Sequence, residues 1–146
     1  MKINKNKGFT LIEILVVIGM IAILATIVII AINPGRQFAQ SRNSQRVSNV
    51  NAILNAVGQN IADNKGVFIC ASQPTTTPAD IKSGGMDLMP CLVPTYLSAV
   101  LFDPKTGTST SVSSYDTKYV VSADVNNRIT VQADDAELGQ VILVSR

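Results

Sequence analysis

The chain has 146 residues, with 12 lysines and arginines against 10 aspartates and glutamates, and it contains no histidine. Hydrophobic residues make up 47% and charged residues 15%, which excludes a disordered acidic tail and a polybasic nucleic-acid-binding protein. Histidine-assisted nucleophilic catalysis and histidine-liganded zinc are excluded too, and two cysteines cannot form a four-thiolate site. We therefore expect one small domain with an additional apolar segment, no enzymatic activity, and neither a metal nor another cofactor.

A long apolar run begins close to the N-terminus. Residues 14–32 are 19 residues without a charged side chain, and only Gly19 and Thr26 interrupt their aliphatic character. As a helix the run would span about 28 Å, close to the hydrocarbon thickness of a bilayer. It is longer than the apolar core of a cleaved secretory signal, and no clear small-residue cleavage site follows it. Taken alone, the run is typical of an uncleaved signal anchor with a cytoplasmic N-terminus.

Basic residues flank the run on both sides. They are Lys2, Lys5 and Lys7 before it, and Arg36, Arg42 and Arg46 after it. Because the counts are equal, the positive-inside rule does not decide the orientation. We interpret the three arginines as a collar just outside the membrane that is either solvated or in contact with another subunit. Lipid headgroups are the next alternative for their partner, and nucleic acid is the last.

Glu13 lies at the edge of the apolar run. A carboxylate at the centre of a bilayer costs about 2.5–3.5 kcal/mol, and less near the interface. One interpretation is that its side chain reaches the interface. The other is that a cation from another chain, or from a new amino terminus, pairs with it, because no lysine or arginine lies between Glu13 and Arg36.

The residues Lys7-Gly8-Phe9-Thr10-Leu11-Ile12-Glu13, followed by the aliphatic run, closely resemble the N-terminal signature of type IV prepilins and of type II secretion pseudopilins. The resemblance implies that a prepilin peptidase cleaves on the cytoplasmic side after Gly8 and that the same enzyme N-methylates Phe9. It also implies that Glu13 pairs with the N-terminal amine of a neighbouring subunit when the filament assembles.

The charges are consistent with that implication. Cleavage before Phe9 would create an α-amino cation, and opposite charges about 4 Å apart at an effective dielectric constant near 20 attract by roughly 4 kcal/mol before desolvation. One docked neighbour could therefore offset the burial of Glu13 and set the axial register. Loss of the three leader lysines leaves nine basic and ten acidic side chains, so we expect no nucleic-acid partner.

A second helix is predicted after the run. Asn33-Pro34-Gly35 interrupts the first helix, because proline lacks a backbone donor and clashes with the preceding turn. Apolar residues then recur at spacings of three and four, at Val47, Val50, Leu54, Val57 and Ile61. This stripe predicts an amphipathic helix that packs on the protein's own sheet and ends near Gly66.

Cys70 and Cys91 flank a stretch rich in proline and glycine. Outside the cytoplasm the two thiols can pair and close a loop, which is worth about 3 kcal/mol in the chain-entropy model. The alternative is two free cysteines in an apolar environment.

Three strands are expected in the last third of the chain. Residues 119–123 and 128–132 flank the turn pair Asn126-Asn127, and residues 141–144 suit a strand buried against the helix. We interpret residues 106–114, which are mostly serine, threonine and glycine, as an exposed loop. The acidic cluster is interpreted as a solvated turn, with a calcium site as the alternative; its members are Asp134, Asp135 and Glu137.

These expectations combine into an α+β fold, in which a long N-terminal, partly transmembrane helix packs through its C-terminal half on a small antiparallel sheet. The expected segments are a leader (1–8), a transmembrane and filament-core helix (9–32), a kinked amphipathic helix (33–66), and a globular region of loops and sheet (67–146).

The resemblance implies a structural subunit of a type IV pilus-like filament. The alternatives are a type II secretion pseudopilin and a DNA-uptake pilin, and the charge and the 5% aromatic content disfavour the latter. The implied partners are copies of itself, minor pilins, the prepilin peptidase, the inner-membrane assembly platform and, before assembly, membrane lipid. The implied location is the bacterial inner membrane, as a single-pass protein with a cytoplasmic leader, and then an extracellular or periplasmic filament.

Overall fold

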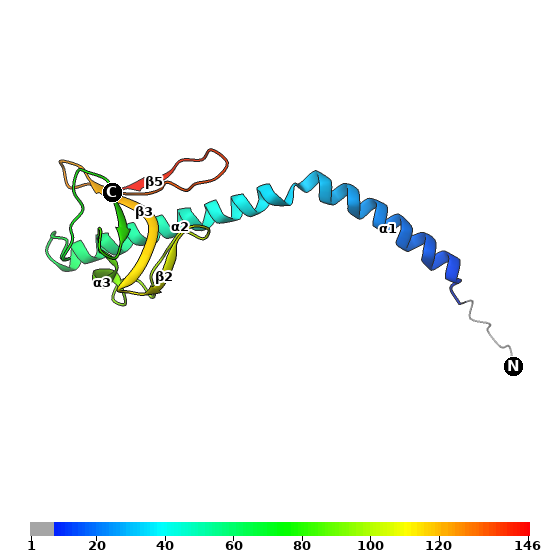
Figure 1. The fold of residues 1–146 in the computed structure, drawn as a ribbon, viewed down its shortest axis with the longest axis horizontal. Coiled ribbons are helices and arrows are strands. Elements are labelled where there is room, and N and C mark those ends of the chain that lie inside the picture. The colour runs from blue at the N-terminus through cyan, green and yellow to red at the C-terminus, as the bar shows by residue number, and fades with distance from the viewer. Residues whose placement is uncertain (1–7) are drawn as a thin grey trace. The chain divides into compact units, whose positions relative to one another are not determined.

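The computed structural model describes residues 8–146. Of the expected leader it describes Gly8 alone, and the three leader lysines lie outside the described residues. The chain divides into two compact units, the first ending at Gln37 and the second spanning Phe38–Arg146. In chain order the elements in Figure 1 are α1 (Leu11–Ile32), α2 (Pro34–Asp63), β1 (Ala79–Lys82), α3 (Met89–Leu92), β2 (Thr108–Ser111), β3 (Ser114–Ala123), β4 (Ile129–Ala133) and β5 (Ile142–Ser145).

Helix α1 ends at a one-residue interruption. Asn33 adopts the left-handed conformation with φ 48°, which asparagine tolerates better than most residues. The residue before a proline is also driven away from the helical region, and α2 begins at Pro34. The Asn33 side chain then accepts a hydrogen bond from the backbone N–H of Arg36 at 3.3 Å and caps the new helix. The break therefore occupies Asn33 alone, and Gly35 is already helical.

The sheet is antiparallel throughout, and β3 is its central strand. Its strand order is β1-β3-β4-β5, and β2 also pairs with β3. Strand β3 pairs with β2 around Tyr115 and with β4 from Tyr119 onward. Between these two regions Lys118 has a φ of 61°, a conformation that bends the strand where its partner changes. The predicted α+β fold, with a helix packed on a small antiparallel sheet, is confirmed.

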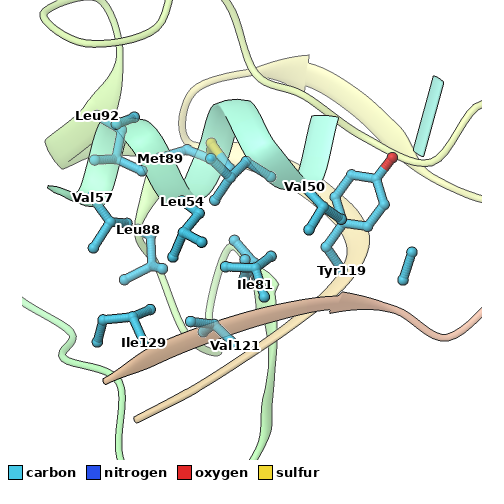
Figure 2. Packing of buried hydrophobic residues seen from close by; sticks show 14 of the residues in the cluster. Val50, Leu54, Val57, Ile81, Leu88, Met89, Leu92, Tyr119, Val121 and Ile129 are labelled. Carbon is cyan, nitrogen blue, oxygen red and sulfur yellow. The ribbon is translucent and has the colours of Figure 1, made fainter. Parts of the chain in front are cut away.

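The core lies between α2 and this sheet. Figure 2 shows Val50, Leu54 and Val57 of α2 directed toward the sheet residues Ile81 and Val121. All five side chains are buried, so the centre of the predicted stripe is correct.

The edges of that stripe differ from the prediction. Val47 keeps 43% of its surface exposed, whereas Ile53, which the stripe omitted, is fully buried. The buried face of α2 is also wider than the stripe because it includes the polar residues Asn43, Asn49 and Asn60. Their amide groups find hydrogen-bond partners in the second unit, which makes their burial tolerable.

Two segments that were expected to be irregular contain strands. The expectation of an exposed loop over residues 106–114 is wrong for β2, which pairs with β3 although most of its side chains stay exposed. Hydroxyl side chains on both faces give no alternation of polar and apolar residues, so the sequence pattern could not reveal this strand. Strand β1 was missed for a different reason, because it is only four residues long and lies within the stretch rich in proline and glycine.

Cys70 and Cys91 form a disulfide with an S–S distance of 2.06 Å and a Cα–Cα distance of 5.6 Å. The bond ties the segment after α2 to the short helix α3.

Candidate functional site

Thr10 and Glu13 form a reciprocal cap at the start of α1. The Thr10 hydroxyl accepts a hydrogen bond from the backbone N–H of Glu13 at 3.3 Å. In return, Glu13 Oε2 accepts the backbone N–H and the hydroxyl of Thr10, each at 2.8 Å. This is a capping box, which satisfies backbone donors that a helix N-terminus otherwise leaves free.

The capping box gives Glu13 partners within its own chain, and both are neutral donors. The two interpretations of Glu13 from the sequence, contact with the interface and pairing with a cation, did not include these partners. The spacing Thr-x-x-Glu before an apolar run is itself the sequence signal of a capping box, so the cap could have been predicted.

Gly8 and Phe9 precede this cap and are exposed. A Cβ atom placed on Gly8 would have no described atom within 4 Å. The peptide bond between Gly8 and Phe9 is therefore uncrowded on the glycine side.

Helix α1 exposes apolar side chains on every side. It is 22 residues long, and none of its residues is buried. By length and composition it is the one helix among residues 8–146 that could cross a membrane. A helix that is apolar all round needs lipid or other apolar helices around it.

Residues 3–29 match the prokaryotic N-terminal methylation motif. The match covers Gly8, Phe9 and the capping box, together with most of α1. It agrees with the resemblance to the signature of type IV pilins and pseudopilins. No curated protein and no solved structure matches the chain.

The second unit contains a separate polar cluster around Arg46. The Arg46 side chain has 0% exposure, and its Nε and Nη2 atoms donate to the two carboxylate oxygens of Asp103 at 2.6 and 3.1 Å. Nη1 donates to the side-chain oxygen of Asn43 at 2.8 Å and to Glu137 at 3.0 Å. The prediction that Arg46 belongs to a solvated or subunit-contacting collar is wrong, because the chain's own carboxylates enclose it.

Glu137 joins this cluster from the loop between β4 and β5. It accepts two hydrogen bonds from Arg42, at 2.6 and 2.8 Å, and one from Lys105 at 3.0 Å, in addition to the bond from Arg46. The prediction of a solvated turn is therefore wrong for Glu137. For the calcium alternative, residues 8–146 hold no group of three or more histidine, cysteine, aspartate or glutamate side chains placed to bind a metal ion.

The cluster lowers the pKa values of both carboxyl groups. Burial alone would raise the pKa of Asp103, but hydrogen bonds from Arg46 and from the backbone N–H groups of Lys105 and Thr106 outweigh it. The hydrogen bonds from Arg42 are the main cause of the lowered pKa of Glu137, and those from Arg46 and Lys105 add to it. Both groups are therefore ionised at neutral pH and neutralise the buried arginine.

The predicted site residues thus lie in two places. Gly8, Phe9 and Glu13 share the start of α1, and the two cysteines pair in the second unit. The Arg46 cluster was missed because its two carboxylates lie 57 and 91 positions from that arginine in the chain, and no local pattern connects them.

Proposed function

We propose that the chain is a structural subunit of a type IV pilus-like filament, cleaved by a prepilin peptidase before Phe9 and polymerised through α1. The observation that carries the proposal is an apolar helix with no buried residue, most of which lies within the methylation motif. The motif is common to pilins and to type II secretion pseudopilins, so a pseudopilin is the second candidate.

The exposed side chains of α1 give the proposal its energetic basis. Burial of one large aliphatic side chain is worth about 1.5–3 kcal/mol. Helix α1 carries many such side chains, from Leu11 to Ile32, and all of them are exposed. In this proposal the inner membrane surrounds the helix before assembly, with the leader on the cytoplasmic side. The α1 helices of other copies and of minor pilins surround it in the extracellular or periplasmic filament.

The proposal gives Glu13 two successive sets of partners. Before assembly the Thr10 cap supplies neutral donors, which reduces the cost of a carboxylate at the edge of the apolar segment. After cleavage the α-amine of Phe9 in a neighbouring copy supplies the cation. The cation adds the attraction between opposite unit charges, roughly 4 kcal/mol at about 4 Å before desolvation, which the neutral donors of the cap do not supply, so the exchange favours assembly.

Processing and assembly can be tested in one set of full-length variants. Gly8→Val places a branched side chain beside the scissile bond, and we expect the precursor to keep its leader. Gly19→Val is the matched control, because a Cβ atom there also has no described atom within 4 Å. The masses of the membrane-bound products show whether each variant has lost its leader, and we expect the leader to be lost from Gly19→Val but not from Gly8→Val. A wild-type product that still begins at Met1 would refute the processing step.

Glu13→Gln keeps the shape of the side chain and removes its charge. We expect normal membrane insertion and cleavage, with a filament yield at least tenfold lower, because an attraction of roughly 4 kcal/mol between unit charges is lost. Thr10→Ser, which retains the capping hydroxyl, should assemble normally. A normal filament yield from Glu13→Gln, measured by electron microscopy and shearing, would eliminate the charge-pairing step.

A further inference from the structure

Strand β5 forms an open margin of the sheet. Within residues 8–146 it pairs with β4 and with no other strand. Figure 1 draws it in red at the margin of the second unit. The opposite margin is covered in part, because the carbonyl group of Asp80 in β1 accepts the backbone N–H of Met86 from the following turn, at 3.2 Å.

The ladder between β4 and β5 fixes which backbone groups face outward. Ile129 and Arg146 exchange two backbone hydrogen bonds, at 2.7 and 2.9 Å. Hydrogen-bonded pairs alternate along an antiparallel ladder, so Val144 also bonds to β4. The N–H and C=O groups of Leu143 and Ser145 consequently point away from β4, toward the open margin.

Two exposed apolar side chains lie along this margin, together with the polar residues Gln140 and Ser145. Val141 is 83% exposed and Leu143 is 51% exposed. Proteins commonly protect an open strand edge with lysine or proline, and residues 139–145 contain neither. The margin therefore offers a row of backbone donors and acceptors beside two exposed apolar side chains, the arrangement that accepts an added strand.

We propose that the open margin of β5 binds β5 of a second copy of this chain, antiparallel and centred on Leu143. In this register Leu143 lies opposite its own counterpart, and Val141 lies opposite Ser145. Arg146 lies opposite the uncharged Gln140, so no like charges meet across the interface. The sequence around Leu143 is thus complementary to itself.

A second copy fits this margin better than another strand of the same chain does. The outer edge of β2 consists of serine and threonine and offers no apolar side chain to Leu143. The two-fold axis of an antiparallel pair stands perpendicular to the sheet, so the α2 helices of the two copies run in opposite directions. The contact therefore closes a pair and cannot extend a fibre, so it does not depend on the proposed filament.

The register can be tested by oxidative crosslinking of the full-length chain in detergent. Both native cysteines are already paired, so Leu143→Cys supplies the one unpaired thiol. The Cα atoms of a hydrogen-bonded antiparallel pair are about 5.5 Å apart, within the range that a disulfide bridges. We expect Leu143→Cys to form a covalent dimer on mild oxidation.

Ser145→Cys is the matched control. It lies on the same edge, but in this register its two copies are separated by about 14 Å along the strands. We expect at least tenfold less dimer from it, whereas a mixture of Val141→Cys and Ser145→Cys chains should crosslink. Equal dimer yields at 143 and 145, no dimer at 143, or coupling of Leu143→Cys to a different protein would each overturn the proposal.

Discussion

Arg46 is a cation without any exposed side-chain surface, in the middle of a helix rich in uncharged polar residues. Its charge is tolerated because Asp103 binds it through two hydrogen bonds and Glu137 adds a third. Among the described residues, every buried side-chain nitrogen or oxygen has a hydrogen-bond partner. A complete set of partners decides whether such a cluster stabilises the fold, because removal of one partner leaves an uncompensated buried charge.

Asp103→Asn tests that dependence. The substitution keeps the size of the side chain but leaves Arg46 without its main counter-charge, and we expect the free energy of unfolding to fall by about 3 kcal/mol. Asp134→Asn, at an exposed position in the same acidic cluster, should change it by less than about 0.5 kcal/mol. Urea titration of the full-length variants in detergent measures both. Equal losses of unfolding free energy in the two variants would show that the buried pair of Arg46 and Asp103 contributes no more to stability than an exposed aspartate does.

At the scale of elements, the segment between α2 and β2 has little regular structure of its own. It contains β1 and the single turn of α3. The disulfide holds α3 from one side. From the other side, the hydroxyl of Tyr115 in β3 donates to Asp87 at 2.5 Å and accepts the backbone N–H of Met89 at 3.2 Å. Long-range bonds therefore replace the local hydrogen bonds of a helix or a hairpin in this segment.

Removal of the disulfide should loosen this segment first. For the double variant Cys70→Ala, Cys91→Ala we expect a loss of about 3 kcal/mol in the free energy of unfolding, through the larger entropy of the unfolded chain. Hydrogen exchange at the centre of β3 should speed up only by the factor that the lost global stability gives, and exchange around Asp87 and Met89 should speed up more, because local opening of this segment adds to it. Wild-type protein treated with reductant is the control and should show the same pattern. Uniform exchange across both regions would contradict a local role for the bond.

At the scale of the whole molecule, the Arg46 cluster joins three parts of the second unit. Arg42 and Arg46 come from α2, Asp103 from the segment before β2, and Glu137 from the loop between β4 and β5. Both carboxyl groups have pKa values below their ordinary range in the folded state. The unfolded chain therefore binds more protons in acid, and stability falls as the pH falls.

We expect this contribution to be complete above about pH 4.3, the ordinary pKa of a glutamate, and to be lost as the pH falls below it, through the lowered pKa values of the folded state. Glu137→Gln removes one of the two titrating groups. The variant should be less stable at pH 7, and its stability should fall less steeply between about pH 4 and pH 2. Unfolding titrations at several pH values measure this slope. Identical slopes for variant and wild type would show that Glu137 does not take part.

The sequence by itself determined the features that depend on residues close together in the chain. Uniform hydropathy identified α1, Asn33 and Pro34 marked its end, and the residues around Gly8 and Glu13 carried the methylation motif. Spacings of three and four placed the centre of the α2 stripe in the core. Each of these signals is complete within a few turns of the chain, so no knowledge of the fold was needed to interpret it.

Only the tertiary structure decided the partners of Arg46, the pairing of β2 and the open margin of β5. The carboxylates that bind Arg46 lie 57 and 91 positions away, and chain topology alone brings them together. Strand β2 has hydroxyl groups on both faces, so its place in the sheet depends on backbone bonds to β3 and not on a hydrophobic pattern. Whether a strand lies at an edge is likewise a property of the whole sheet, because it depends on which other strands occupy the neighbouring positions.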